Sequence, residues 1–227
     1  MVPVFSEPVS IAVPGNVELA GDLDVPASPR GIVLFVHGSG SSRHSPRNRA
    51  VARQLRQEGW GTLLIDLLDQ DEEQADAATG RHRFDIPLLA ERTVTAIDWL
   101  GTHPATSTLG VHLFGASTGA AAALTAAAAR PHRVLSVVSR GGRPDLADHA
   151  LPHVQAPVLL LVGGRDTQVL GLNREAAGLL HTGHRVQTVP GATHLFEEPG
   201  ALDHVARAAQ EWFRHTTQTR NNPGRAA

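Results

Sequence analysis

The 227-residue sequence contains no cysteine, no lysine and no tyrosine, and its other aromatic residues are only six Phe and three Trp. Without cysteine the chain has no disulfide, no thiolate metal site and no cysteine nucleophile. Without lysine it has neither a Schiff-base amine nor the lysine of a phosphate-binding P-loop. The few aromatic side chains argue against a base-stacking surface for nucleic acids. Covalent catalysis would therefore fall to serine, threonine, histidine or a carboxylate.

Charge and hydropathy give a second set of exclusions. The 20 basic residues are all arginine, and with 22 acidic residues the formal net charge is −2, so neither a nucleic acid nor a membrane surface is an expected partner. No apolar run reaches the length of a membrane span, and no basic segment precedes an apolar one as in a secretory signal. We expect a cytoplasmic protein, monomeric or homodimeric. Its histidine pairs lack an obvious third ligand, so we expect no metal site.

Strand and helix patterns alternate along the chain after a hairpin predicted at 9–13 and 17–25. Further strands are predicted at 31–36, 60–65, 109–114, 134–139, 157–162 and 185–189, and helices at 46–58, 88–100, 120–129, 172–180 and 201–216. This order predicts an α/β fold, a mostly parallel sheet with an N-terminal antiparallel hairpin and helices on both faces. We expect one domain over 1–216, a disordered tail over 217–227, and a surface loop or short, partly helical flap over 66–87.

The pentapeptide Gly115-Ala116-Ser117-Thr118-Gly119 lies between a predicted strand and an alanine-rich helix. A serine flanked by glycines at a sharp strand-to-helix turn is typical of the nucleophile elbow of serine hydrolases. The glycines remove side chains that would collide at the turn, and the helix N-terminus favours negative charge near the serine. Ser117 is therefore the candidate nucleophile; the alternative is an ordinary glycine-flanked turn with a surface serine.

Two further polar residues follow predicted strands, namely Asp166 after 157–162 and His194 after 185–189. Ligands of parallel sheets bind at the carboxyl ends of the strands, so Ser117, Asp166 and His194 are expected to converge there. An imidazole can take the proton of an attacking serine, and an aspartate can fix its tautomer. The chain order Ser, Asp, His is the order that accompanies the elbow. Asp145 is the alternative acid.

Attack on a carbonyl creates an oxyanion that needs preset donors. We expect one from the backbone N–H of Thr118 and a second from the loop that follows the strand 31–36. Ser39 is the predicted second donor, with Gly38 and Gly40 as alternatives.

Arginines lie near both sides of the predicted site. Arg43 follows the oxyanion loop and Arg140 follows a strand end. A guanidinium fork suits a carboxylate or phosphate, so either residue could hold an anionic group of the substrate. The alternative is that these arginines pair with acidic residues or face solvent.

The motifs His37-Gly38-Ser39-Gly40, Gly115 to Gly119, Gly163-Gly164-Arg165-Asp166 and Gly191-Ala192-Thr193-His194 together resemble the α/β-hydrolase superfamily, and within it the small dienelactone hydrolase-like branch. The resemblance covers about residues 10–216. It implies an α/β-hydrolase fold without a large cap and a Ser–Asp–His triad that needs no cofactor.

One position departs from that branch, because dienelactone hydrolases proper use cysteine at the elbow and this chain has Ser117. The serine favours an esterase. We therefore expect hydrolysis of a small carboxylic ester, with an anionic group as one option, through an acyl-enzyme on Ser117. The alternatives are a thioesterase, lactonase or acyltransferase with the same triad, and a hydrolase-fold binding protein without turnover.

Overall fold

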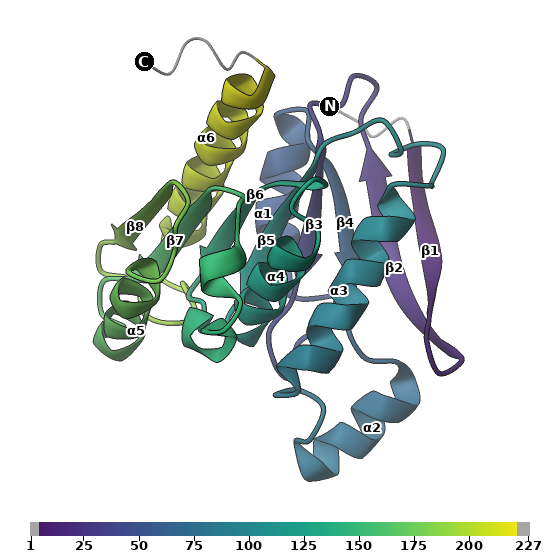
Figure 1. Ribbon diagram of the computed structural model, residues 1–227, viewed down its shortest axis with the longest axis horizontal. Coiled ribbons are helices and arrows are strands. Elements are labelled where there is room, and N and C mark those ends of the chain that lie inside the picture. Colours follow the sequence, from purple (N-terminus) through teal and green to yellow (C-terminus); the bar gives the residue numbers. More distant parts are fainter. Residues whose placement is uncertain (1–4, 222–227) are drawn as a thin grey trace.

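The computed structural model describes residues 5–221, which form one eight-stranded sheet between two layers of helices (Figure 1). The strand order is β1-β2-β4-β3-β5-β6-β7-β8. The strands are β1 (Phe5–Val13), β2 (Val17–Val25), β3 (Ile32–Val36), β4 (Gly61–Ile65), β5 (Val111–Ala116), β6 (Val134–Arg140), β7 (Val158–Gly163) and β8 (His184–Val189). The β1–β2 and β2–β4 pairs are antiparallel and the remaining pairs are parallel, which confirms the predicted fold class.

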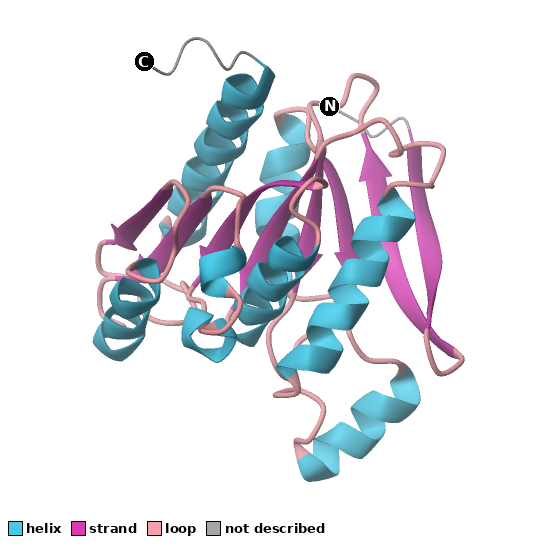
Figure 2. Ribbon diagram, in the orientation of Figure 1, coloured by secondary structure: helices cyan, strands magenta, loops and turns pink. Residues whose placement is uncertain are grey.

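Helices cover both faces of the sheet (Figure 2). The helices on the faces are α1 (Pro46–Gln57), α3 (Ile86–Leu100), α4 (Thr118–Ala129), α5 (Thr167–Ala177) and α6 (Ala201–Asn221), whereas α2 (Gln70–Thr79) lies beyond one edge of the sheet (Figure 1). One core cluster joins α1 and α6 to one face, and the other joins α3, α4 and α5 to the opposite face. The strands β3, β5 and β7 are buried along their whole length, as their continuous apolar runs require.

Small residues let α4 approach the sheet closely. A Cβ atom at Gly119 would lie 2.3 Å from the carbonyl oxygens of both Val36 and His37. The alanines that follow are buried, so the first turns of α4 pack directly on β3 and β5. This contact fixes the position of the turn at Ser117.

The helices depart from the sequence predictions in two places. Residues 70–79, expected as a loop or partly helical flap, form α2, which begins with a capping box between Asp69 and Glu72. Helix α5 begins at Thr167 rather than near 172. Between β6 and β7 the helical structure is limited to two short 3-10 turns, Pro144–Ala147 and Leu151–His153, which agrees with the expected fold without a large cap at that connection.

The prediction of a disordered tail from 217 is wrong over its first part, because α6 continues to Asn221. The hydroxyl of Thr217 donates to the carbonyl of Phe213 at 2.8 Å and lies 3.2 Å from Nε2 of the buried His112. The first bond lies within α6, and the contact with His112 of β5 attaches this part of the helix to the sheet. Residues 222–227 lie outside the described part of the chain. Within residues 5–221, no helix has the length and apolar character that crossing a membrane requires.

Candidate active site

The turn at Ser117 has the geometry of a nucleophile elbow. Ser117 has φ 51° and ψ −124°, a strained left-handed conformation for a residue other than glycine. It stands at the N-cap of α4, yet its side chain makes no capping hydrogen bond, so its hydroxyl remains available. A Cβ atom at Gly115 would lie 2.5 Å from Cα of Ala120, which explains why glycine stands before the turn.

The structure pairs His194 with Asp166, with 2.7 Å between Nδ1 and Oδ2. Asp166 stands at the N-cap of α5, but its carboxylate does not cap that helix and faces the imidazole instead. The loop carrying His194 passes close to the end of β7 because Gly163 has no side chain. A Cβ atom there would lie 2.5 Å from the carbonyl oxygens of Ala192 and Thr193.

The alternative acid is engaged elsewhere. The Asp145 carboxylate accepts three hydrogen bonds from the guanidinium of Arg143, at 2.8, 3.2 and 2.7 Å. It is not among the hydrogen-bond partners of His194 within the described residues.

Ser117 and His194 line one cavity of about 210 Å³ at the carboxyl ends of the strands. Within residues 5–221, the hydrogen bonds of His194 include Asp166 and not Ser117. Such a contact often tightens only when substrate binds. The three predicted side chains therefore meet at one edge of the sheet, as the strand-end argument required.

The predicted oxyanion loop lies against the elbow. A Cβ atom at Gly38 would be 2.9 Å from Cβ of Ser117, so only glycine fits there. The backbone N–H of Ser39 donates to Oγ1 of Thr118 at 2.8 Å. The predicted second donor is thus beside the site, but in the resting structure it has a protein acceptor.

His37 holds this loop in place. Its Nε2 accepts from the backbone N–H of Leu67 at 3.0 Å, which leaves Nδ1 to donate to the carbonyl of Gly38 at 2.9 Å. Burial lowers the pKa of His37, although the Gly38 hydrogen bond opposes that shift. The neutral ring therefore acts as a fixed brace between the oxyanion loop and the end of β4.

The two arginines predicted to bind an anion, Arg43 and Arg140, have different surroundings in the structure. Arg43 pairs with Asp66, and its Nε lies 3.7 Å from Asp22. It does not line the cavity that contains Ser117. The structure therefore places Arg43 in a surface ion-pair cluster rather than at the site.

Arg140 lies in the Ser117 cavity and is only 7% exposed. Its Nη2 donates to Oδ1 of Asn48 at 3.2 Å, and its guanidinium lies 5.7 Å from the ring centroid of Phe196. Its Nε has no hydrogen-bond partner within the described chain. Burial, and then the charge of Arg47, lower the pKa of Arg140 to about 10, so it stays cationic at neutral pH.

Three residues of this cavity region were not predicted. Asn48 lies in the first turn of α1, where the amphipathic pattern gives no sign that it faces a site. Leu195 and Phe196 directly follow His194; Leu195 lines the cavity and is 41% exposed, whereas Phe196 is buried with φ 56°. Their position after a candidate catalytic histidine was the only signal in the sequence.

An eight-stranded sheet of this order, with a serine elbow and a His–Asp pair at its carboxyl edge, defines an α/β-hydrolase. More narrowly, the chain belongs to the dienelactone hydrolase family, whose model matches residues 19–222.

A dienelactone hydrolase structure from Anabaena variabilis is 58% identical with a TM-score of 0.91, covering 93% of this chain and 97% of that one. Est1E from Butyrivibrio proteoclasticus shares the fold, with 16% identity, a TM-score of 0.77 and coverage of 92% and 98%.

A longer relative comes from Mycobacterium tuberculosis strain H37Rv and is provisionally named a phosphoribosyl transferase. It is 54% identical over 211 residues, which are 93% of this chain and 46% of that protein. The chain therefore spans about half the length of this relative.

Proposed function

We propose that the protein hydrolyses small carboxylic esters through an acyl-enzyme on Ser117. In the first step Oγ of Ser117 bonds to the ester carbonyl carbon while Nε2 of His194 takes the hydroxyl proton. The C–O bond to the alcohol then breaks, and His194 returns that proton to the departing oxygen. Asp166 holds the ring in the required tautomer and stabilises the imidazolium. The 2.7 Å contact between His194 and Asp166 is the observation that carries the proposal.

Water completes the reaction in a second attack of the same kind, in which water is the nucleophile and Oγ of Ser117 is the leaving group. His194 removes a proton from water as its oxygen attacks the acyl carbon, and the proton passes to Oγ of Ser117 as the ester bond breaks. The backbone N–H groups of Thr118 and Ser39 would stabilise both oxyanions. Because the N–H of Ser39 already donates to Oγ1 of Thr118, it would have to turn toward the oxyanion or be shared with it.

Within this proposal, Arg140 binds an anionic group of the substrate. Burying a charge is unfavourable unless an opposite charge or hydrogen bonds compensate it. Arg140 has only the neutral Asn48 amide as a side-chain hydrogen-bond partner within the described residues, and its Nε is unpartnered. A carboxylate in the Ser117 cavity would supply the missing acceptor. Arg43 also has an Nε without a hydrogen-bond partner, but its charge is already balanced by Asp66 and, at 3.7 Å, by Asp22.

Labelling with a fluorophosphonate tests the serine mechanism directly. The intact wild-type protein should gain the mass of one phosphonyl group, and peptide mapping should place it on Ser117. The Ser117→Ala variant should keep its mass. A wild-type protein that stays unmodified while an authentic serine esterase is labelled in parallel would instead indicate a hydrolase-fold binding protein. Turnover of small activated esters then measures the hydrolytic step.

Thioesters, lactones and acyl acceptors other than water remain alternative uses of the same triad, because they differ only in the leaving group or the acceptor. The names of other matched proteins refer to other reactions. One of these proteins is a dienelactone hydrolase-like promiscuous phosphotriesterase with 17% identity. The transferase name of the Mycobacterium protein refers to a chain of which this sequence matches 46%. The family match over residues 19–222 supports hydrolysis as the chemistry of the matched region.

A further inference from the structure

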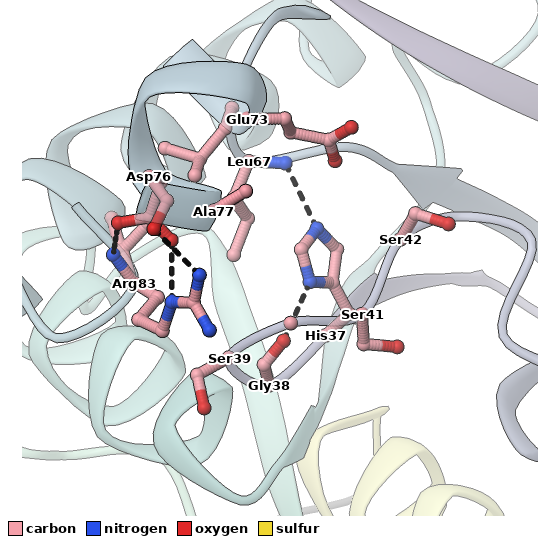
Figure 3. A pocket seen from close by; sticks show the side chains of 13 residues that line it. His37, Gly38, Ser39, Ser41, Ser42, Leu67, Glu73, Asp76, Ala77 and Arg83 are labelled. Atoms are coloured by element: carbon pink, nitrogen blue, oxygen red, sulfur yellow. Dashed lines mark hydrogen bonds and ion pairs between the residues drawn. The ribbon is translucent and has the colours of Figure 1, made fainter. Parts of the chain in front are cut away.

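A second cavity of about 300 Å³ lies beneath α2, beside the oxyanion loop (Figure 3). Gly38, Ser39 and Ser41 line both this cavity and the one that contains Ser117, so the loop forms a common wall. Beyond the loop 37–42, the lining combines apolar side chains with three charged ones: Leu67, Leu68, Ala77, Leu89, Glu73, Asp76 and Arg83. A cavity with this volume and mixed lining falls within the range of small-molecule sites.

Two arginines hold the roof of this cavity, Arg92 from α3 and Arg83 from the segment that follows α2. The buried Arg92 of α3 donates to the carbonyl of Leu67 at 2.5 Å and to the Glu72 carboxylate of α2 at 2.7 Å. Arg83 donates to the carboxylate and the carbonyl of Asp76, at 2.5 and 2.7 Å (Figure 3). Arg92 therefore bonds the first turn of α2 to α3, and Arg83 bonds the segment after α2 back onto that helix.

The roles of the triad determine which half of an ester would face this cavity. His194 must protonate the departing oxygen, so the leaving group lies on the His194 side, near Leu195 and Arg140. The acyl group then extends away from His194, toward the loop that both cavities share. Gly40 of that loop lines the second cavity and is not crowded, because a Cβ atom there would have only a guanidinium nitrogen of Arg83 within 4 Å, at 3.9 Å.

We propose that the cavity beneath α2 binds the acyl part of the substrate and selects short, uncharged acyl chains. This inference rests on the proposed ester hydrolysis and adds the substrate class. Leu68, Leu89 and Ala77 of α2 give the cavity an apolar lining that suits an aliphatic chain, and its volume of about 300 Å³ favours a short one. Glu73, whose pKa is raised by burial and then by Asp66, places a carboxylate at the rim that disfavours an anionic chain. The two sides thus differ in charge: Arg140 lies on the leaving-group side, whereas on the acyl side Arg83 is paired with Asp76 and Glu73 adds a further carboxylate.

Two adjacent alanines on α2 provide a matched test, since both are exposed and only Ala77 lines the cavity. Ala77→Trp should lower kcat/KM for nitrophenyl hexanoate by about tenfold or more while nitrophenyl acetate changes by less than about twofold, because each methylene in such a pocket contributes selectivity. Ala78→Trp should leave both values near those of the wild type. An unchanged chain-length preference in Ala77→Trp, or the same loss in both variants, would overturn the inference.

A separate comparison tests the proposed preference for uncharged acyl chains. Glu73→Gln should raise kcat/KM for the nitrophenyl monoester of succinate relative to nitrophenyl butanoate, and an unchanged ratio would overturn this part. Failure of the acyl-pocket inference is separable from failure of the proposed function. If Ser117 is labelled and acetate is hydrolysed while the chain-length profile stays the same, only the acyl pocket is wrong. If the wild type neither labels at Ser117 nor turns over acetate, the proposed esterase itself is wrong.

Discussion

Nδ1 of His194 lies 2.7 Å from Oδ2 of Asp166, although 28 residues separate them in sequence. The bond holds the imidazole with Nε2 free to face the cavity that Ser117 lines. It also removes Asp166 from the capping of α5, a role for which its position alone would suit it. A carboxylate that leaves a helix end uncapped in order to bind a histidine indicates a functional rather than a structural role.

Replacing Asp166 with Asn should reduce kcat for an activated ester by about 10⁴-fold, because the amide would favour the wrong imidazole tautomer. The fold should be retained, since the side chain makes no capping bond. The matched control is Asp145→Asn, whose carboxylate pairs with Arg143. Steady-state kinetics should show near wild-type kcat for this control, and equal losses in the two variants would argue against Asp166 as the triad acid.

Arg140→Ala should selectively weaken turnover of esters whose leaving group carries a carboxylate. Loss of a charge-assisted hydrogen bond of about 1.5–3 kcal/mol corresponds to roughly a 10- to 100-fold fall in kcat/KM. The neutral nitrophenyl ester should change much less. Arg43→Ala is the control, because its guanidinium already pairs with Asp66. If the ratio of charged to neutral turnover is the same in all three proteins, the anionic subsite does not exist.

Two glycines in helices should respond oppositely to alanine. At Gly119 the new Cβ would lie 2.3 Å from backbone oxygens of β3 and its following loop, and backbone cannot yield as a side chain can. Gly119→Ala should therefore cost about 1–3 kcal/mol or more of unfolding free energy. Gly171 of α5 has nothing within 4 Å of its Cβ position, so Gly171→Ala should stabilise by about 0.4–1 kcal/mol. Urea unfolding of both variants measures the difference, and a neutral Gly119→Ala would refute the close contact.

The sequence was sufficient for the sheet and for the three residues at its carboxyl edge. Buried parallel strands are continuous apolar runs, and their ends carry the motifs around Ser117, Asp166 and His194, so no long-range information was needed to place them. The helix α2 was harder to predict because it is polar on nearly all sides and has no helical apolar stripe. Its capping box, Asp69 with Glu72, was the local signal that could have revealed its start.

The arginines show what sequence reasoning could not resolve. Arg43 and Arg140 both follow strand ends or site loops, so they appear equivalent along the chain. They differ in the partners that the fold brings to them from distant segments. Asp66, at the end of β4, faces Arg43, whereas Arg140 meets the neutral Asn48 of α1. Pairings across 23 and 92 residues depend on the completed sheet and leave no local pattern.

Stability at acidic pH should depend on His112, which lies under α6 and is fully buried. Burial lowers its pKa from 6.5 to about 3, and its ring nitrogens contact the hydroxyls of Ser136 at 2.8 Å and Thr217 at 3.2 Å. Below pH 6.5 His112 is protonated in the unfolded chain but stays neutral in the folded protein. The free energy of unfolding therefore falls as the pH drops from 6.5 toward 3. Between pH 7 and pH 5 this histidine should account for about 2 kcal/mol.

The measurement is the unfolding free energy of wild type and His112→Gln at pH 7 and pH 5. Because glutamine does not titrate, the variant should lose about 2 kcal/mol less than the wild type on acidification, whatever its stability at pH 7. His37, whose pKa burial also lowers, contributes in the same direction to both proteins and cancels in the comparison. His149→Gln, at an exposed histidine, should keep the wild-type dependence. An acid loss in His112→Gln as large as in the wild type would mean that His112 is not held neutral in the folded protein.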